Sequence, residues 1–445
     1  MRLVARPSGP IRSPDMGRVR PPGDKSISHR ALLFGALADG VTTIDGLLES
    51  EDVLCTAAAM RAFGAGVTRS ASGRWTVVGR GAAGFAEPAG PIDFGNSGTG
   101  VRLTMGAAAA FPIKVTYTGD ASLSGRPMGR ILDPLALMGA RWSARDKGLL
   151  PATVHGGALR AIAYESPHAS AQIKSAILLA GLGADGQTSV TEPRASRDHT
   201  ERMLRAFGAE VRESTGADGR HTATVKGGAR LRGQPIAVPA DPSSAAFLAA
   251  AALIVPGSEV ILDDVCLNPL RTGFFDTIAD MGGGAETIDV RDAGGEPVGT
   301  LRVRAPQRLR GAAPPEARAA SMIDEYPILS ALAAFADGET TLSGAAELRV
   351  KESDRIALMV EGLHACGVDA DERPDGLVIH GRGPGGVPGG ATVRTHGDHR
   401  IAMSFLILGL GAQAPVVVED AEMIATSFPG FADLMRSLGA DISEA

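Results

Sequence analysis

The sequence predicts an α/β protein built from six copies of one structural repeat, arranged as two pseudo-symmetric lobes of three copies each. Two series of helices recur at the same interval along the chain, and short β-prone runs such as Val41–Ile44 and Val416–Val418 lie between them. The length of 445 residues exceeds what one ordinary hydrophobic core organises. The length therefore agrees with the division of the repeats into two lobes.

The helices of the first series are amphipathic, and each is expected to end at a glycine. These glycines stand at positions 64, 139, 208, 282, 367 and 439, so that 69 to 85 residues separate each from the next. A glycine after the last turn adopts the left-handed conformation that lets the chain leave the helix and enter a strand. We therefore expect six surface helices, each followed by a strand.

The helices of the second series are apolar on all sides. They are expected to begin near Ser26, Gly98, Ser170, Ser243, Asp324 and Asp398, at intervals of 72 to 81 residues. Nearly uniform apolar runs follow these starts, as in Ala245–Val255. A helix that is apolar all round is buried. These six helices are therefore expected to form the cores of the lobes.

A linker near the middle of the chain divides the six copies into two sets. The segment Val238–Pro242 contains two prolines and follows the third copy. The N-terminal strand, near Arg2–Arg6, is expected to join copies four to six. We expect one lobe to comprise residues 1–18 and 239–445 and the other residues 19–238, with the active site in the cleft between them.

Composition excludes several classes of function. The net charge is −6 and the pI about 5.9, whereas nucleic-acid-binding domains are usually basic. Aromatic residues make up 4% of the chain, too few for a base-stacking surface. Any anion-binding site must therefore depend on local clusters of basic residues.

Cysteine usage and hydropathy predict a cytoplasmic protein. Cys55, Cys266 and Cys366 are odd in number and far apart, which matches neither a disulfide framework nor a metal site. The N-terminus shows no signal peptide, and the longest apolar runs are shorter than the roughly 20 residues that span a bilayer. Frequent Ala, Gly and Arg suggest a GC-rich bacterial genome.

Residues suited to anions gather where the buried helices begin. The six groups are Lys25, Ser26 and Arg30; Asn96, Gly98 and Arg102; Ser170, Gln172 and Lys174; Asp241, Ser243 and Ser244; Asp324 and Glu325; and His396, Asp398, His399 and Arg400. Free backbone N–H groups and the helix dipole favour a phosphate or carboxylate at such a position. Ser26 or Ser28 is expected to cap the first of these helices.

Three polar turns are expected to face the same cleft. They are Ser124–Arg130, Arg194–His199 and Arg349–Arg355. Arginine binds carboxylates and phosphates with two parallel hydrogen bonds, so several converging arginines indicate a polyanionic substrate. Asp324 and Glu352 are the acidic groups in this basic setting, which suits them to general acid–base catalysis.

Most of these residues also have an ordinary structural interpretation. Ser170, Ser243 and Ser244 are equally well explained as helix N-caps. Asp398 and His399 fit a buried cap and its partner. The spacing of residues 351–355 fits a solvated, salt-bridged helix. The recurrence of polar groups at the same point of each copy favours a binding site.

Several familiar motifs are absent from the sequence. Gly23–Ser26 lacks the Gly-Lys pair of a phosphate-binding loop, and Gly95–Gly98 lacks the glycine spacing of a dinucleotide fold. His396 and His399 have no further ligands at zinc spacing. We therefore expect no metal and no cofactor.

The chain resembles the 5-enolpyruvylshikimate-3-phosphate synthase family in five segments: Gly23–Arg30, Gly95–Thr99, Arg126–Gly129, Arg349–Arg355 and Asp398–Arg400. The resemblance extends from about Arg18 to Pro429. Ser321–Pro327 and Met423–Pro429 are most similar to the class II branch, which includes glyphosate-tolerant enzymes. The resemblance implies two inside-out α/β lobes, each of three βαβαββ units.

The resemblance also implies the reaction. The carboxyvinyl group of phosphoenolpyruvate is transferred to the 5-hydroxyl of shikimate 3-phosphate by addition and elimination, in the pathway to chorismate and the aromatic amino acids. The expected partners are these two small molecules alone, without nucleic acid or membrane, and the protein is expected to be a monomer and a glyphosate target.

The resemblance further implies roles for individual residues. Those expected to hold shikimate 3-phosphate are Lys25, Ser26, Arg30, Ser170, Ala171, Gln172, Arg197, Asp324 and Lys351. Those expected to hold phosphoenolpyruvate are Lys25, Asn96, Gly98, Arg126, Gln172, Arg355 and Arg400. Asp324 is expected to take the proton of the 5-hydroxyl. Glu352 and Lys25 are candidates for delivering protons to C3 and to the leaving phosphate.

Two positions depart from the family pattern. Many members carry a lysine in the segment before Phe428-Pro429, where this chain has Ala425-Thr426-Ser427, so one contact to phosphoenolpyruvate is missing or replaced. Position 98 is glycine, where a tolerant enzyme of the class II branch carries alanine. An added methyl group there would crowd glyphosate more than phosphoenolpyruvate, so we expect this protein to be sensitive.

Two other functions fit the sequence less well. UDP-N-acetylglucosamine enolpyruvyl transferases share the fold and the donor but use a cysteine in a mobile loop of the first lobe, and this chain has no cysteine between Cys55 and Cys266. A binding protein that had lost catalysis would not be expected to keep the set Lys25, Asp324, Glu352 and Arg355.

Overall fold

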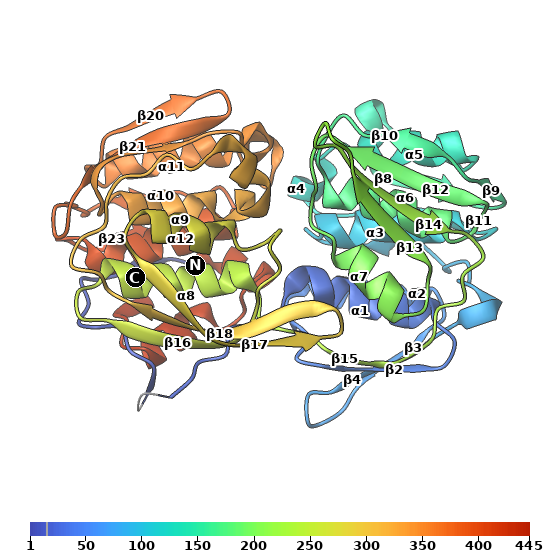
Figure 1. Ribbon diagram of the computed structural model, residues 1–445, viewed down its shortest axis with the longest axis horizontal. Helices are drawn as coiled ribbons and strands as arrows, with labels where there is room; N and C mark the ends of the chain where they lie inside the picture. Colours follow the sequence, from blue (N-terminus) through green and yellow to red (C-terminus); the bar gives the residue numbers. More distant parts are fainter. Residues whose placement is uncertain (15–16) are drawn as a thin grey trace. The chain divides into compact units, whose positions relative to one another are not determined.

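The computed structural model describes residues 1–14 and 17–445. Their contacts divide the chain into two compact units (Figure 1). Unit 1 consists of Met1–Pro22, Pro239–Asp292 and Pro297–Ala445, and unit 2 consists of Gly23–Val238 and Ala293–Glu296. The short segment Ala293–Glu296 forms the turn between β17 (Gly284–Ala293) and β18 (Glu296–Arg304). It belongs to unit 2, whereas the rest of these two strands belongs to unit 1.

Unit 2 contains three four-stranded sheets with one common topology. Their strand orders are β15 (Pro235–Ala237), β2 (Val41–Asp45), β4 (Trp75–Val78), β3 (Gly66–Arg69); β5 (Ile92–Asp93), β6 (Lys114–Thr118), β8 (Leu149–His155), β7 (Arg141–Arg145); and β10 (Ala163–Glu165), β12 (Gln187–Glu192), β14 (His221–Lys226), β13 (Val211–Thr215). In each sheet the first pair is parallel and the other two pairs are antiparallel. The threefold recurrence confirms the predicted repeat.

Unit 1 contains three further sheets. Their strand orders are β16 (Glu259–Cys266), β18 (Glu296–Arg304), β17 (Gly284–Ala293); β19 (Asp337–Leu342), β21 (Gly376–Arg382), β20 (Ala370–Arg373); and β22 (Thr392–Val393), β23 (Val416–Val418), β1 (Leu3–Ala5), β24 (Ile442–Glu444). The N-terminal strand β1 pairs antiparallel with both β23 and β24, so it completes the last sheet. The N-terminal strand therefore lies in one sheet with the last strands of the chain.

The apolar helices form the interior of each unit. They are α1 (Lys25–Leu37), α3 (Gly98–Ala109) and α6 (Ala171–Gly181) in unit 2, and α8 (Pro242–Ile254), α10 (Tyr326–Ala333) and α12 (His399–Gly411) in unit 1. Every residue of α8 is buried. The helices α8, α10 and α12 pack against one another, as α3 does against α1 and α6. The predicted burial of this helix series is therefore confirmed.

Close packing of α3 against α6 depends on a glycine. A Cβ atom added to Gly106 would lie 2.2 Å from the carbonyl oxygen of Ala176 and 2.6 Å from its Cα. Since no side chain fits that distance, the two backbones approach as closely as they do only because residue 106 is glycine.

The amphipathic helices cover the outside. They are α2 (Glu51–Ala62), α5 (Gly129–Met138), α7 (His199–Ala206), α9 (Gly273–Asp280), α11 (Arg355–Ala365) and α13 (Phe431–Ser437). The six predicted glycines follow these helices, and all six have a φ between +77° and +113°. The chain therefore leaves every outer helix through the left-handed conformation, as predicted. Among the described residues no helix is both long and apolar enough to cross a membrane.

Candidate active site

Lys25 is the first residue of α1 and lies beside an acidic residue of α2. Its ammonium group forms an ion pair with the carboxylate of Asp52, and its side chain is 21% exposed. The helix is capped by Asp24, whose Oδ1 accepts a hydrogen bond from the Ile27 N–H at 2.8 Å. The prediction that Ser26 or Ser28 caps this helix is wrong, because the helix begins one residue before Ser26.

Arg30 is buried and held inside unit 2. Its Nε donates to Thr200 Oγ1 at 2.7 Å, its Nη2 to Ser175 Oγ at 2.9 Å, and its Nη1 to the Ser26 carbonyl at 3.0 Å. Burial lowers the pKa of Arg30 to about 10, so the side chain remains charged at neutral pH. Arg30 thus connects α1 to α6 and α7 and places a fixed positive charge behind the start of α1.

Gln172 connects the starts of α3 and α6. Its Nε2 donates to Thr99 Oγ1 at 2.9 Å, and its Oε1 accepts from Arg102 Nη1 at 2.7 Å. Ser97 caps α3 by accepting from the Gly100 N–H at 3.2 Å. The structure therefore brings Gln172 next to the Gly98 turn, as an anion site shared by two repeats requires.

Arg126 also lies against this turn. Its Nη2 donates to Asn96 Oδ1 at 2.5 Å and to Ser122 Oγ at 2.9 Å, and Asn96 in turn donates to Asp120 Oδ2 at 2.8 Å. A Cβ atom at Gly98 would lie 3.2 Å from Arg126 Nη1. Asn96, Gly98 and Arg126 therefore form one group in which a guanidinium faces the start of a helix.

The third repeat contributes Ser170 and Ala171 at the start of α6. The Ser170 N–H donates to Glu192 Oε1 at 2.7 Å, whereas its side chain makes no capping hydrogen bond. Ser170 therefore occupies the N-cap position of α6, but its side chain does not cap the helix. Arg197 lies half-buried in the turn that leads into α7.

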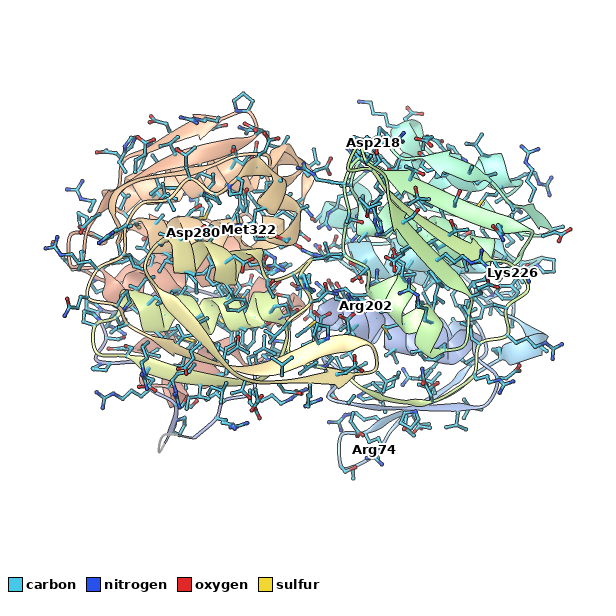
Figure 2. All side chains as sticks on the ribbon, in the orientation of Figure 1. Arg74, Arg202, Asp218, Lys226, Asp280 and Met322 are labelled. Carbon is cyan, nitrogen blue, oxygen red and sulfur yellow. The ribbon has the colours of Figure 1, made fainter. Side chains whose placement is uncertain are left out.

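The segment Ala293–Glu296, which its contacts assign to unit 2, packs on α7 of this repeat. Arg202 donates to the carbonyl of Gly295 at 2.6 Å, and His199 Nδ1 lies 2.7 Å from Glu296 Oε1. Arg202, labelled in Figure 2, also pairs with Asp198 at 2.7 Å. These contacts fix the first turn of α7, which directly follows Arg197.

In unit 1, Arg355 is surrounded by carboxylates. Its Nε lies 2.8 Å from Asp398 Oδ2, its Nη2 2.6 Å from Glu352 Oε2, and its Nη1 3.4 Å from Asp324 Oδ1. Burial lowers the pKa of Arg355, but the three carboxylates raise it by more than burial lowers it, so the net shift is upward. The guanidinium is therefore permanently charged.

Asp324 lies between two cations. Besides Arg355, the Nζ of Lys351 lies 3.5 Å from Asp324 Oδ1, and Arg400 Nη1 donates to the Asp324 carbonyl at 2.9 Å. The Asp324 side chain is 12% exposed. The structure therefore brings together the five residues of unit 1 that were expected to bind substrate or act in catalysis: Asp324, Lys351, Glu352, Arg355 and Arg400.

The segment 351–353 is not helical, so the interpretation of residues 351–355 as a solvated, salt-bridged helix is wrong. The helix α11 begins only at Arg355, where Asp354 accepts from the Ala357 N–H at 3.1 Å as its N-cap. Lys351 and Glu352 consequently belong to a turn, and their side chains reach Asp324 and Arg355 instead of lining a helix face.

Asp398 is a buried N-cap, as its structural interpretation proposed. Its Oδ1 accepts from the Arg400 N–H at 2.9 Å, and its main side-chain partner is Arg355, not His399. Burial raises the pKa of Asp398, but the adjacent Arg355 lowers it more, so the net shift is downward.

The start of α8 depends on a residue that the sequence did not single out. Asp241 caps the helix by accepting from the Ser243 N–H at 2.8 Å. Arg271 Nη2 donates to Asp241 Oδ1 at 2.9 Å and to Ser243 Oγ at 3.0 Å. Ser243 itself donates to Glu325, so its interpretation as an N-cap is wrong. No local pattern marks Arg271, because its partner lies 30 residues earlier.

Thr426 occupies the place where the family resemblance led us to expect a lysine. It is buried, and its Oγ1 donates to the Met423 carbonyl at 2.7 Å. A neutral hydroxyl bound to the backbone thus replaces the expected charge. Among the described residues, no group of three or more His, Cys, Asp or Glu side chains is arranged to hold a metal ion.

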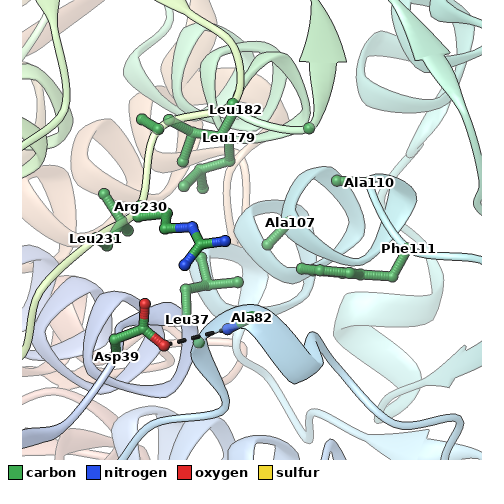
Figure 3. Close-up of a pocket in the computed structure, with 14 residues that line it drawn as sticks. Leu37, Asp39, Ala82, Ala107, Ala110, Phe111, Leu179, Leu182, Arg230 and Leu231 are labelled. Atoms are coloured by element: carbon green, nitrogen blue, oxygen red, sulfur yellow. Dashed lines mark hydrogen bonds between the residues drawn. The ribbon is translucent and has the colours of Figure 1, made fainter.

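A cavity of about 200 Å³ lies at the other end of the interior helices of unit 2 (Figure 3). Its lining includes Leu37, Ala107, Ala110, Leu179 and Leu182, which stand at or next to the C-terminal ends of α1, α3 and α6. The candidate residues stand at the N-terminal ends of these helices. The cavity is therefore separate from the candidate site.

Comparison with solved structures defines the class of protein. The enolpyruvyl transferase NikO from Streptomyces tendae has the same fold, with a TM-score of 0.77 at 17% identity over 100% of this chain and 98% of that one. An EPSP synthase from Acinetobacter baumannii matches with a TM-score of 0.87 at 43% identity over the whole of both chains. The fold is that of the enolpyruvyl transferases.

Sequence comparison identifies the family. Residues 11–435 match the family model for EPSP synthase, 3-phosphoshikimate 1-carboxyvinyltransferase. A 3-phosphoshikimate 1-carboxyvinyltransferase of Caulobacter vibrioides is 59% identical over 100% of this chain and 99% of its own, and one from Phenylobacterium zucineum is 58% identical over 99% and 95%. The chain belongs to the EPSP synthase family.

Proposed function

We infer that this protein is an enzyme that transfers the carboxyvinyl group of phosphoenolpyruvate to the 5-hydroxyl of shikimate 3-phosphate, releasing phosphate. The observation that carries this inference is the Asp324 constellation of unit 1, in which one carboxylate lies against Lys351 and Arg355. A base for a hydroxyl and two cations for anionic substrates are what this reaction requires. Family membership supplies the identity of the substrates.

The reaction proceeds by addition and elimination. Asp324 takes the proton of the 5-hydroxyl while the hydroxyl oxygen forms a bond to C2 of phosphoenolpyruvate. In the same addition C3 of phosphoenolpyruvate gains a proton. The tetrahedral product then loses phosphate from C2 and a proton from C3, which restores the double bond. Glu352 and Lys25 are the proposed proton carriers for C3 and for the leaving phosphate.

We propose that the residues singled out by the family resemblance bind the two substrates. Shikimate 3-phosphate is held by Lys25, Ser26, Arg30, Ser170, Ala171, Gln172, Arg197, Asp324 and Lys351, and phosphoenolpyruvate by Lys25, Asn96, Gly98, Arg126, Gln172, Arg355 and Arg400. The recurrence of these residues at helix starts supports the assignment, because helix N-termini favour anions. The side chains of Lys25, Arg126 and Arg400 add the required positive charge.

Phosphate release tests this function directly. Purified protein with shikimate 3-phosphate and phosphoenolpyruvate is expected to release phosphate and to form 5-enolpyruvylshikimate 3-phosphate, detected by mass spectrometry. Release with UDP-N-acetylglucosamine in place of shikimate 3-phosphate would assign the chain to the rival acceptor. If no phosphate is released with either acceptor, the proposal is contradicted.

We also propose that the enzyme acts as a cytoplasmic monomer. Cys55, Cys266 and Cys366 form no disulfide among the described residues, and Cys266 and Cys366 are buried. Cysteines that are not joined in disulfides are typical of a reducing compartment. Light scattering during gel filtration is expected to give the mass of one 45.6 kDa chain.

A further inference from the structure

A fully buried ion cluster lies directly behind two of the proposed substrate-binding turns of unit 2. The Nζ atom of Lys174 lies 3.1 Å from Glu192 Oε2 and 2.9 Å from Glu201 Oε1, and all three side chains are 0% exposed. We call these three residues the Lys174 cluster. None of them has a role in the proposed reaction.

Stability alone is a weak reason for such a cluster. Taking charged side chains out of water is costly, and well-packed apolar residues often stabilise a core as well or better. Burial lowers the pKa of Lys174, but the two carboxylates raise it more, so Lys174 stays protonated. A buried ammonium that keeps its charge calls for a role that an apolar side chain cannot fill.

The cluster binds the backbone of both turns. Glu192 Oε1 accepts from the Ser170 N–H at 2.7 Å and, through both oxygens, from Ser196 Oγ at 2.7 and 2.9 Å. Lys174 Nζ donates to the Ser196 carbonyl at 3.1 Å. Residue 170 directly precedes Ala171, and residue 196 directly precedes Arg197. Two turns that lie 26 positions apart in the sequence are therefore fixed by one group of charges.

The same region holds Arg30. Ser175 and Thr200 stand next to Lys174 and Glu201 in the sequence, and their hydroxyl oxygens lie 2.7 Å apart. Arg30 donates to both hydroxyls. Arg30, a third residue proposed to hold shikimate 3-phosphate, is thus held by the sequence neighbours of two members of the Lys174 cluster.

We propose that Lys174, Glu192 and Glu201 are positioning residues that hold Ser170 and Arg197 at the separation required to bind shikimate 3-phosphate. This proposal rests on the proposed function of the two turns. The physical reason is that a binding group gains affinity only when it is fixed in place beforehand, and a displacement of about 1 Å is costly. An apolar residue at 174 would leave the Ser196 carbonyl without its donor and Glu192 without its cation.

The test removes the buried ammonium and compares the variant with a matched control. Lys174→Met is expected to weaken shikimate 3-phosphate binding, measured by titration calorimetry without phosphoenolpyruvate, by roughly tenfold or more. The KM for phosphoenolpyruvate and kcat are expected to stay within about threefold, because the groups that bind the donor and carry the chemistry are untouched. Lys226→Met makes the same change at an exposed position of the same unit (Figure 2) and is expected to bind like the parent protein.

Two conservative variants keep the test decisive if Lys174→Met does not fold. Glu192→Gln removes the charge that contacts both turns, whereas Glu201→Gln changes a group that reaches them through Lys174. The loss of shikimate 3-phosphate affinity is expected to be larger for Glu192→Gln than for Glu201→Gln. A merely structural role would lower the melting temperature and leave affinity unchanged in the folded fraction.

The outcomes separate this inference from the proposed function. If the parent protein does not bind shikimate 3-phosphate, the proposed function of the turns is wrong. If the parent protein binds it and the folded Lys174 and Glu192 variants bind it equally well, the positioning role is wrong.

Discussion

Arg355 and Asp398 form a buried ion pair, 2.8 Å from Nε to Oδ2, that joins the first residue of α11 to the N-cap of α12. The side chains of these residues are 2% and 0% exposed. Through its other nitrogens the same guanidinium contacts Glu352 and Asp324, so a structural pair and a proposed catalytic group share one cation.

Arg355→Gln is expected to reduce both stability and activity. It leaves Asp398 buried without its cation, and breaking a buried pair in this way costs about 3–5 kcal/mol. Urea denaturation measures the loss of unfolding free energy, and the phosphate-release assay measures activity. Arg394→Gln is the matched control, because Arg394 is 74% exposed and its pair with Glu419 is worth at most about 1 kcal/mol. Equal destabilisation by both variants would contradict the role of the buried pair.

Asp398→Asn is expected to reveal the pH dependence of this pair. The pKa of Asp398 is lowered in the folded state, so its ionised form stabilises the protein above the unfolded pKa of about 4, and that stabilisation is lost as the pH falls through the lower, folded pKa. The difference in unfolding free energy between parent and variant should therefore be constant from pH 7 to pH 5 and shrink below about pH 4. A difference that grows on acidification would refute the assignment.

Asp324→Asn tests the proposed base. The amide keeps the shape of the side chain but does not accept the hydroxyl proton, so kcat is expected to fall by about 10²- to 10⁴-fold. Binding of shikimate 3-phosphate, followed by calorimetry, should persist, since the other contacts remain. Retained turnover in the variant would remove Asp324 from the role of base.

Gly98→Ala tests the predicted sensitivity to glyphosate. The new methyl group would press on Arg126 Nη1 at 3.2 Å and on Arg102 Nη1 at 3.3 Å, which narrows the proposed phosphoenolpyruvate site. The inhibition constant for glyphosate is expected to rise about tenfold or more, with a smaller rise in the KM for phosphoenolpyruvate. Comparable inhibition of parent and variant would show that position 98 does not control sensitivity.

Gly106→Ala is expected to destabilise unit 2 through its interior. The added Cβ meets the Ala176 backbone at 2.2 Å, so α3 and α6 must separate, at a cost of about 1–3 kcal/mol or more. Gly157→Ala is the control, because a Cβ atom there meets no atom within 4 Å. Chemical denaturation should distinguish the two variants, and similar midpoints would mean that the helices do not depend on this close approach.

The sequence by itself determined the repeat and the family. The six glycines after the outer helices and the uniform apolar runs of the inner helices are local features, since a left-handed φ and an all-round apolar surface are decided by residues next to one another. Five short segments, from Gly23–Arg30 to Asp398–Arg400, were together enough to recognise the EPSP synthase family.

Only the tertiary structure decided how the charged residues pair. Lys174 had no visible partner in the sequence, yet Glu192 and Glu201 meet it from a strand end and from α7. Asp24, not a serine, proved to cap α1. Local sequence patterns do not show which charged residues pair, because the partners approach one another only when separate helices and turns pack together. Once such groups are buried, each of them requires a partner.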